Sequence, residues 1–143
     1  MSSKKLQCGI PELRLLREWQ NRLGLQDWYV VLETNSKPNN MDLQDADGCL
    51  SYVETTKSAK IQIIDPKLRT NGLRPFDFEE TLVHELLHMK MCLLERGENW
   101  DKKLQLRLLH VILDDLARAL VDAKRSSKSP RKRRTLKQTN KGE

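Results

Sequence analysis

The chain's most specific pattern for chemistry is His-Glu-x-x-His, formed by His84, Glu85 and His88. On a helix, residues four apart lie on one face, about 6 Å apart along the axis, so both imidazoles can reach a single metal ion. Glu85 projects about 100° around the helix from His84, where it can act on a metal-bound water without being a ligand. This spacing predicts metal-assisted hydrolysis with Glu85 as the general base.

A second interpretation of the same stretch is a core helix with two hydrogen-bonded histidines. The flanking residues are apolar and repeat at helical spacing, as expected of a helix buried against a sheet. The members of this stripe are Leu82, Leu86, Met89 and Leu93. A third metal ligand would separate the two interpretations, because catalytic zinc takes three ligands from the protein and one water.

The best candidate for the third ligand is His110, the last of the three histidines in the chain. Cys92 is excluded because it would lie about 12 Å along the helix axis from His84. His110 belongs to a later helical stripe with Leu106, Leu113, Ala117 and Leu120. The alternative for His110 is a core histidine that makes one hydrogen bond.

Asp114 follows His110 by one helical turn and therefore lies beside it. Its carboxylate could accept a hydrogen bond from the free ring nitrogen of a metal-bound His110 and so orient the imidazole. The alternative is an exposed charge, the interpretation favoured for the adjacent Asp115.

These residues require elements to position them, and the sequence predicts an α+β fold. Pro11 suits a first helical turn, Gly24 suits a helix end, and Asp77 with Glu80 resembles a capping box. Aromatic and β-branched runs indicate short strands. The expected elements are a helix at 11–23, strands at 28–33, 49–54 and 59–64 in an antiparallel or mixed sheet, the His-Glu-x-x-His helix from 77 to 95 or 96, and a backing helix at 101–124.

The formal charge of +6 is concentrated at one end of the chain. Residues 124–143 hold nine of the 26 basic side chains and one of the 20 acidic ones, which leaves −2 for residues 1–123. We therefore expect a domain at 1–123 and a basic, disordered tail at 124–143. Arg131, Lys132, Arg133 and Arg134 are candidates for phosphate contacts with nucleic acid, and the alternative is a solvated tail without a partner.

The apolar content favours a cytoplasmic protein without a membrane partner. There is no run of about 18 apolar residues, and the first residues lack the apolar segment of a secretory signal. The three cysteines, Cys8, Cys49 and Cys92, are an odd and scattered set that fits reduced thiols.

Together, the His84-Glu85-x-x-His88 helix, His110 on the next helix and Asp114 beyond it resemble the zincin metallopeptidases. The closest resemblance is to minimal gluzincins and to short metallopeptidases of phages and prophages, and it covers residues 11–123. It implies Zn²⁺ as cofactor and a peptide or protein substrate, extended along an exposed strand edge at 49–54 or 59–64.

One departure leaves the subclass open, because gluzincins have Glu where His110 stands. SprT-type proteases, which act on DNA-bound proteins, have a third His and stay open as relatives. A hypothesis of another class also stays open: a nucleic-acid-associated accessory protein whose His-Glu-x-x-His helix is structural or binds zinc without catalysis.

Overall fold

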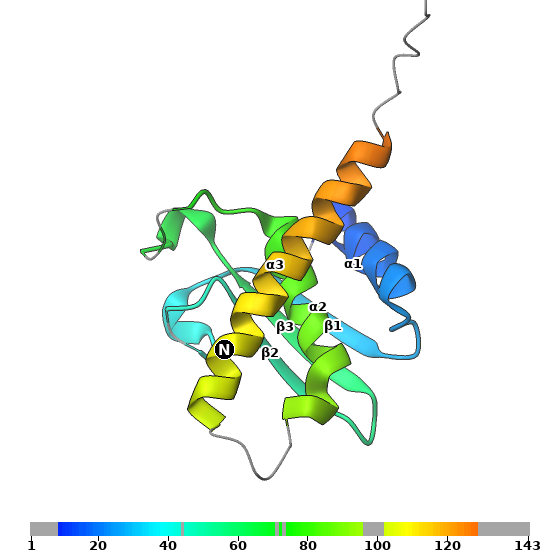
Figure 1. The fold of residues 1–143 in the computed structure, drawn as a ribbon. Helices are drawn as coiled ribbons and strands as arrows, with labels where there is room; N and C mark the ends of the chain where they lie inside the picture. The colour runs from blue at the N-terminus through cyan, green and yellow to red at the C-terminus, as the bar shows by residue number, and fades with distance from the viewer. Residues whose placement is uncertain (1–8, 44, 71, 73, 96–101, 129–143) are drawn as a thin grey trace, which may run out of the picture.

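The computed structural model describes residues 9–43, 45–70, 72, 74–95 and 102–128, which form a small α+β fold. Figure 1 shows a sheet with helices packed on it. In chain order the elements are α1 (Ile10–Leu23), β1 (Tyr29–Ser36), β2 (Gly48–Val53), β3 (Ser58–Ile64), α2 (Phe78–Glu95) and α3 (Lys102–Lys128), with 3-10 turns η1 (Pro38–Asn40) and η2 (Pro66–Leu68). The predicted fold class is confirmed.

The sheet is mixed, with strand order β1-β3-β2. β3 pairs in parallel with β1 and antiparallel with β2, so Ile61 lies opposite both Leu32 and Leu50. Because β3 is paired on both sides, the edge expected at 59–64 is not free to bind a substrate. The other strand expected to bind a substrate, at 49–54, corresponds to β2, which lies at an edge of the sheet.

α2 is the central helix of the fold, with α3 on one side and the sheet on the other (Figure 1). Leu82, Leu86 and Met89 are buried as the stripe predicted. Val83 and Leu87 are buried as well, because neighbouring elements cover more than one face of α2. The side chain of Leu93 lies outside the described residues.

α1 packs on α2 through Leu16 and Trp19, both buried. Leu13, one turn earlier on the same helix, is 40% exposed. Gln20 is buried instead, and its amide donates to the carbonyl oxygens of Leu25 and Trp28. This hydrogen bonding ties the end of α1 to the chain that leads into β1.

α3 continues to Lys128, beyond the boundary predicted at residue 124. Lys124 is buried and contacts the carboxylates of Glu79 and Glu18, and its ammonium lies 5.2 Å from the centre of the Trp19 ring. Residues 124–128 therefore belong to the folded domain, which corrects the predicted start of the tail. Arg131, Lys132, Arg133 and Arg134 lie outside the described residues.

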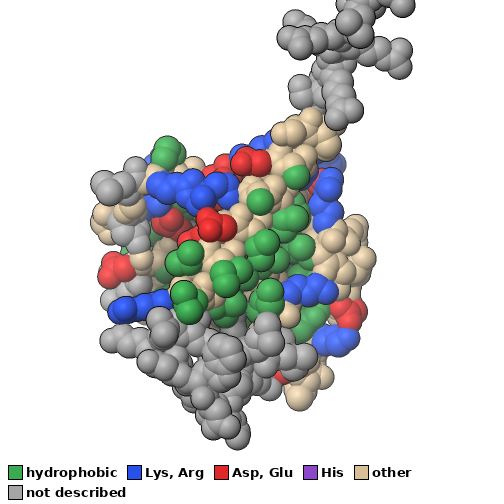
Figure 2. Space-filling view, viewed as in Figure 1, with side chains coloured by type: hydrophobic (Ala, Val, Ile, Leu, Met, Phe, Trp, Pro, Cys, Tyr) green, Lys and Arg blue, Asp and Glu red, His purple; other side chains and the backbone are tan. Residues whose placement is uncertain are grey.

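α3 buries Leu113, Ala117 and Val121 against α2. His110, expected on this buried stripe, is exposed. Apolar side chains also occupy the outward face of α3, where they form a patch visible in Figure 2. Its members are Leu108, Val111, Ile112 and Leu116. Within the described chain, no helix has the length and apolar character needed to cross a membrane.

Candidate metal centre

The structure brings together the three histidines that the sequence proposed as ligands. Nε2 of His84 lies 3.1 Å from Nε2 of His88 and 3.3 Å from Nδ1 of His110. The ligand atoms of all three residues lie within 4.8 Å of one another. Two nitrogens come from successive turns of α2 and one from α3, so the cluster depends on the packing of these two helices.

This spacing fits a zinc ion. Zinc–nitrogen bonds of 2.0–2.1 Å in a tetrahedral site imply about 3.3 Å between neighbouring ligand nitrogens. The two nitrogen–nitrogen distances from His84 are close to that value, and the ligand atoms of His88 and His110 lie within 4.8 Å of each other. Three imidazole nitrogens also match the ligand preference of Zn²⁺, and they leave the fourth tetrahedral position open, as in catalytic zinc sites.

His84 is largely enclosed, with 13% of its side chain exposed, whereas His110 is exposed. Burial lowers the pKa of His84 below the ordinary 6.5; Asp114 opposes this shift, and His88 and His110 add to it. The neutral imidazole, which is the form that binds metals, is therefore favoured at neutral pH.

Asp114 contacts a different histidine from the one predicted. Its Oδ1 lies 2.8 Å from Nδ1 of His84, on the ring edge opposite the nitrogen that faces the other two histidines. The geometry departs from an in-line hydrogen bond, so Nδ1 of His84 has no well-aligned acceptor. Asp114 can still orient a ligand imidazole, but that imidazole is His84 across the helix interface and not His110 on its own helix.

Glu85 of α2 is buried beside the histidines, where α2 faces the start of β2. A Cβ atom added to Gly48 would lie 2.6 Å from Oε1 of Glu85 and 2.9 Å from Cγ2 of Thr81. The absence of a side chain at Gly48 therefore lets β2 approach α2 at the position of Glu85. Cys49, the next residue of β2, is a buried free thiol. Burial raises its pKa, and the negative charge of the nearby Glu85 carboxylate raises it further.

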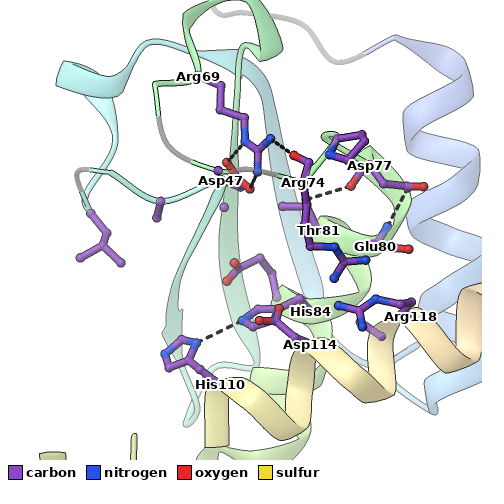
Figure 3. A pocket seen from close by; sticks show the side chains of 17 residues that line it. Asp47, Arg69, Arg74, Asp77, Glu80, Thr81, His84, His110, Asp114 and Arg118 are labelled. Atoms are coloured by element: carbon purple, nitrogen blue, oxygen red, sulfur yellow. Dashed lines mark hydrogen bonds and ion pairs between the residues drawn. The ribbon is translucent and has the colours of Figure 1, made fainter. Parts of the chain in front are cut away.

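Two of the histidines, His84 and His110, line one end of a cleft of about 390 Å³ together with Glu85. Its walls come from the loop before β2, the segment before α2, α2 itself and α3. Figure 3 shows His84, His110 and Asp114 at one end and several charged side chains toward the other. The cleft is therefore open to a ligand larger than water at the position where Glu85 faces it.

Two ion pairs hold the walls of this cleft. Arg69 donates from Nε and Nη2 to the two carboxylate oxygens of Asp47 at 2.7 and 2.8 Å, and from Nη1 to the carbonyl oxygen of Arg74. Asp77 caps α2 as predicted, accepting from the amides of Glu79 and Glu80. Asp77 also pairs with Arg125, which joins the start of α2 to α3.

Sequence reasoning missed Gly48, the Asp47–Arg69 pair and two arginines of the cleft, Arg74 and Arg118. A glycine at the start of a strand is a weak signal of close backbone approach, and it was available at Gly48. Arg118 lies two turns after His110 on one side of α3, so the helix spacing also contained a signal for it. The side chain of Cys92, excluded as a ligand by spacing, lies outside the described residues.

Models of known families, curated proteins and solved structures were all compared with this chain, and none matches it. Any functional conclusion therefore depends on the geometry of the site.

Proposed function

We propose that this protein is a zinc-dependent metallopeptidase. The observation that supports the proposal best is the convergence of ring nitrogens from His84, His88 and His110 at spacings that fit zinc, next to buried Glu85 in an open cleft. A core helix with two satisfied histidines would not require a third histidine from α3 at the same point.

In this proposal His84, His88 and His110 hold the ion, and Asp114 orients the His84 ring. When bound, zinc supplies a Lewis acid that polarises a carbonyl and lowers the pKa of water to near 7. Glu85 takes a proton from the attacking water and passes it to the leaving amine. The free edge of β2 binds the extended peptide through backbone hydrogen bonds.

The experiment that tests catalysis is peptide cleavage by the zinc-loaded full chain. A library of peptides from a digested proteome is incubated with the protein, and new amino termini are identified by mass spectrometry. Glu85→Gln should keep its zinc and lose cleavage, because it removes the base and none of the three ligands. Equal cleavage by wild type and Glu85→Gln contradicts the proposed mechanism.

The competing hypothesis of a nucleic-acid-associated protein depends on a tail that lies outside the described residues beyond 128. The first two basic residues assigned to it, Lys124 and Arg125, are occupied by ion pairs within the domain. We also propose a cytoplasmic location, which the buried free thiol of Cys49 supports.

A further inference from the structure

The cleft continues beyond the histidines to a second group of charged side chains. Figure 2 shows Lys and Arg side chains where the segment before α2 faces α3. Among the charges that line this end of the cleft, Asp47 and Arg69 pair with each other and Asp77 pairs with Arg125. These pairs are satisfied internally and leave little charge for a ligand.

Two arginines of the cleft are much less satisfied. Among the described residues, Arg118 on α3 reaches only Asp115, at 3.4 Å, and its buried Nε has no hydrogen-bond partner there. The guanidinium of Arg74 makes no ion pair with any side chain in the described part of the chain. Figure 3 shows both side chains extending over the cleft from different walls. Two guanidinium groups with unused donors therefore face the same space.

Besides Asp114 in the cleft and Asp115, the partner of Arg118, the carboxylate of Glu80 lies near these arginines. Burial raises its pKa, Asp77 raises it further, and Arg74 lowers it only in part. No ion pair within 4 Å joins Glu80 to Arg74 or Arg118 in the described structure.

We propose that Arg118 and Arg74 form a binding subsite for a carboxylate of the peptide substrate. This inference rests on the proposed peptidase function and specifies its substrate class: peptides with an acidic group near the cleaved bond. Guanidinium groups suit this role because their donors match the two oxygens of a carboxylate.

The position of the carboxylate follows from the helix. Arg118 is eight residues after His110, about 12 Å along the axis of α3. An extended peptide advances about 3.3 Å per residue, and the arginine side chains can lean toward either end. The acidic group therefore lies about two to four residues from the bond over the histidines. It is either an Asp or Glu side chain or the carboxylate at the end of the peptide chain.

Binding tests this subsite independently of catalysis. The probes are fluorescein-labelled alanine-based octapeptides in which one Glu is moved along the chain, each with a Gln counterpart, and each made with a free or an amidated C-terminus. Affinity is measured by fluorescence anisotropy on the Glu85→Gln protein, which cannot cleave them under the proposed mechanism.

We expect the Glu peptide to bind about tenfold more tightly than its Gln counterpart at one or two adjacent positions, or the free acid to exceed the amide by that factor. The first result identifies a side-chain carboxylate, the second a terminal one. Arg118→Gln should reduce the preference to less than about twofold, and Arg118→Lys should retain part of it. The matched control is Arg107→Gln, an exposed arginine of α3 outside the cleft, which should keep the full preference.

The subsite is overturned if each Glu peptide binds as tightly as its Gln counterpart and the free acid binds as tightly as the amide. It is also overturned if the preference survives in Arg118→Gln, or if no peptide binds up to millimolar concentration. These outcomes are distinct from failure of the proposed function. A protein that binds zinc and cleaves peptides without this preference retains the function and loses the subsite. A protein that shows the preference but binds no zinc retains the subsite and loses the function.

Discussion

Asp114 of α3 contacts His84 of α2, with 2.8 Å between Oδ1 and Nδ1, and it does so from the side of the ring opposite the histidine cluster. This contact joins the two helices at the candidate metal centre. It also places a carboxylate where it can fix the ring orientation and tautomer of one ligand.

Asp114→Asn should weaken zinc binding by about tenfold, the lower end of the usual range for such partners, because the Asp114 side chain is 63% exposed. Competition with a chromophoric zinc chelator measures the affinity. Asp115→Asn, which changes the neighbouring exposed carboxylate, is the control and should have no effect. Equal affinities for Asp114→Asn and wild type would show that the contact does not tune the site.

Gly48→Ala should reduce turnover while zinc stays bound. The new methyl group would meet Oε1 of Glu85 and Cγ2 of Thr81, so the base must move or β2 must shift away from α2. We expect a cost of about 1–3 kcal/mol in the free energy of unfolding, as for other overpacked sites. Parallel measurement of zinc content, chemical denaturation and peptide cleavage checks it. The control Ser51→Ala, at an exposed position on the same strand, should change neither zinc content, stability nor cleavage. Full activity in Gly48→Ala would exclude a role of Gly48 in positioning Glu85.

Lys124→Ala should destabilise the fold by about 2–3 kcal/mol, less than for a fully buried pair because Glu18 is one-third exposed. The substitution removes the ammonium group that pairs with the carboxylate of Glu79, whose side chain is only 11% exposed, so a largely buried negative charge loses a partner. Urea denaturation gives the difference in free energy. Lys128→Ala, with its side chain 64% exposed, should stay near the wild-type value.

The same ion pairs determine how the tail should be removed. A chain ending at Lys128 keeps the Lys124 and Arg125 contacts and should fold, whereas one ending at 123 should be destabilised. Only the chain ending at Lys128 can therefore test nucleic-acid binding. If the tail binds phosphates, the full chain should show salt-sensitive affinity for DNA or RNA that the truncated chain lacks. Equal affinity of both chains would remove the tail from consideration.

The stability of the metal-free protein should fall in acid. Hydrogen bonds from Arg125 hold the pKa of Asp77 below its ordinary 3.8. For Glu79, burial raises the pKa, but hydrogen bonds from Lys124 and Trp19 outweigh burial and bring the pKa below the ordinary 4.5. A lowered folded-state pKa stabilises the fold above the unfolded pKa, and this stabilisation is lost as pH falls below about 4.5. Arg125→Gln should reduce the slope of unfolding free energy against pH between about pH 5 and pH 3. An unchanged slope would contradict the assigned cause.

The sequence predicted the parts of this site that depend on spacing within one helix. His84 and His88 lie one turn apart on α2, and His110 could be identified because the chain contains only one other histidine. The partner of Asp114 could not be predicted, because spacing along α3 reveals its neighbour on the same helix but not which α2 side chain faces it. For the same reason the approach of Gly48 to Glu85 and the pairing of Lys124 with Glu79 required the packed structure.

The extent of α3 was mispredicted for a related physical reason. A run of basic residues resembles a solvated tail when read alone, and Lys124 begins such a run. In the fold, Trp19 and two carboxylates surround its ammonium group, which offsets the cost of burying the charge. The composition of a segment therefore did not determine where the domain ends.

The most direct test of the proposed metal centre is the zinc stoichiometry of the purified full chain, measured by elemental analysis after dialysis against a weak chelator. We expect about one zinc per chain in wild type and Glu85→Gln, and strongly reduced zinc in His88→Ala and His110→Ala, with each apo variant still folded by circular dichroism. Wild-type protein that retains no zinc, or His110→Ala that retains as much as wild type, would contradict the proposed metal centre.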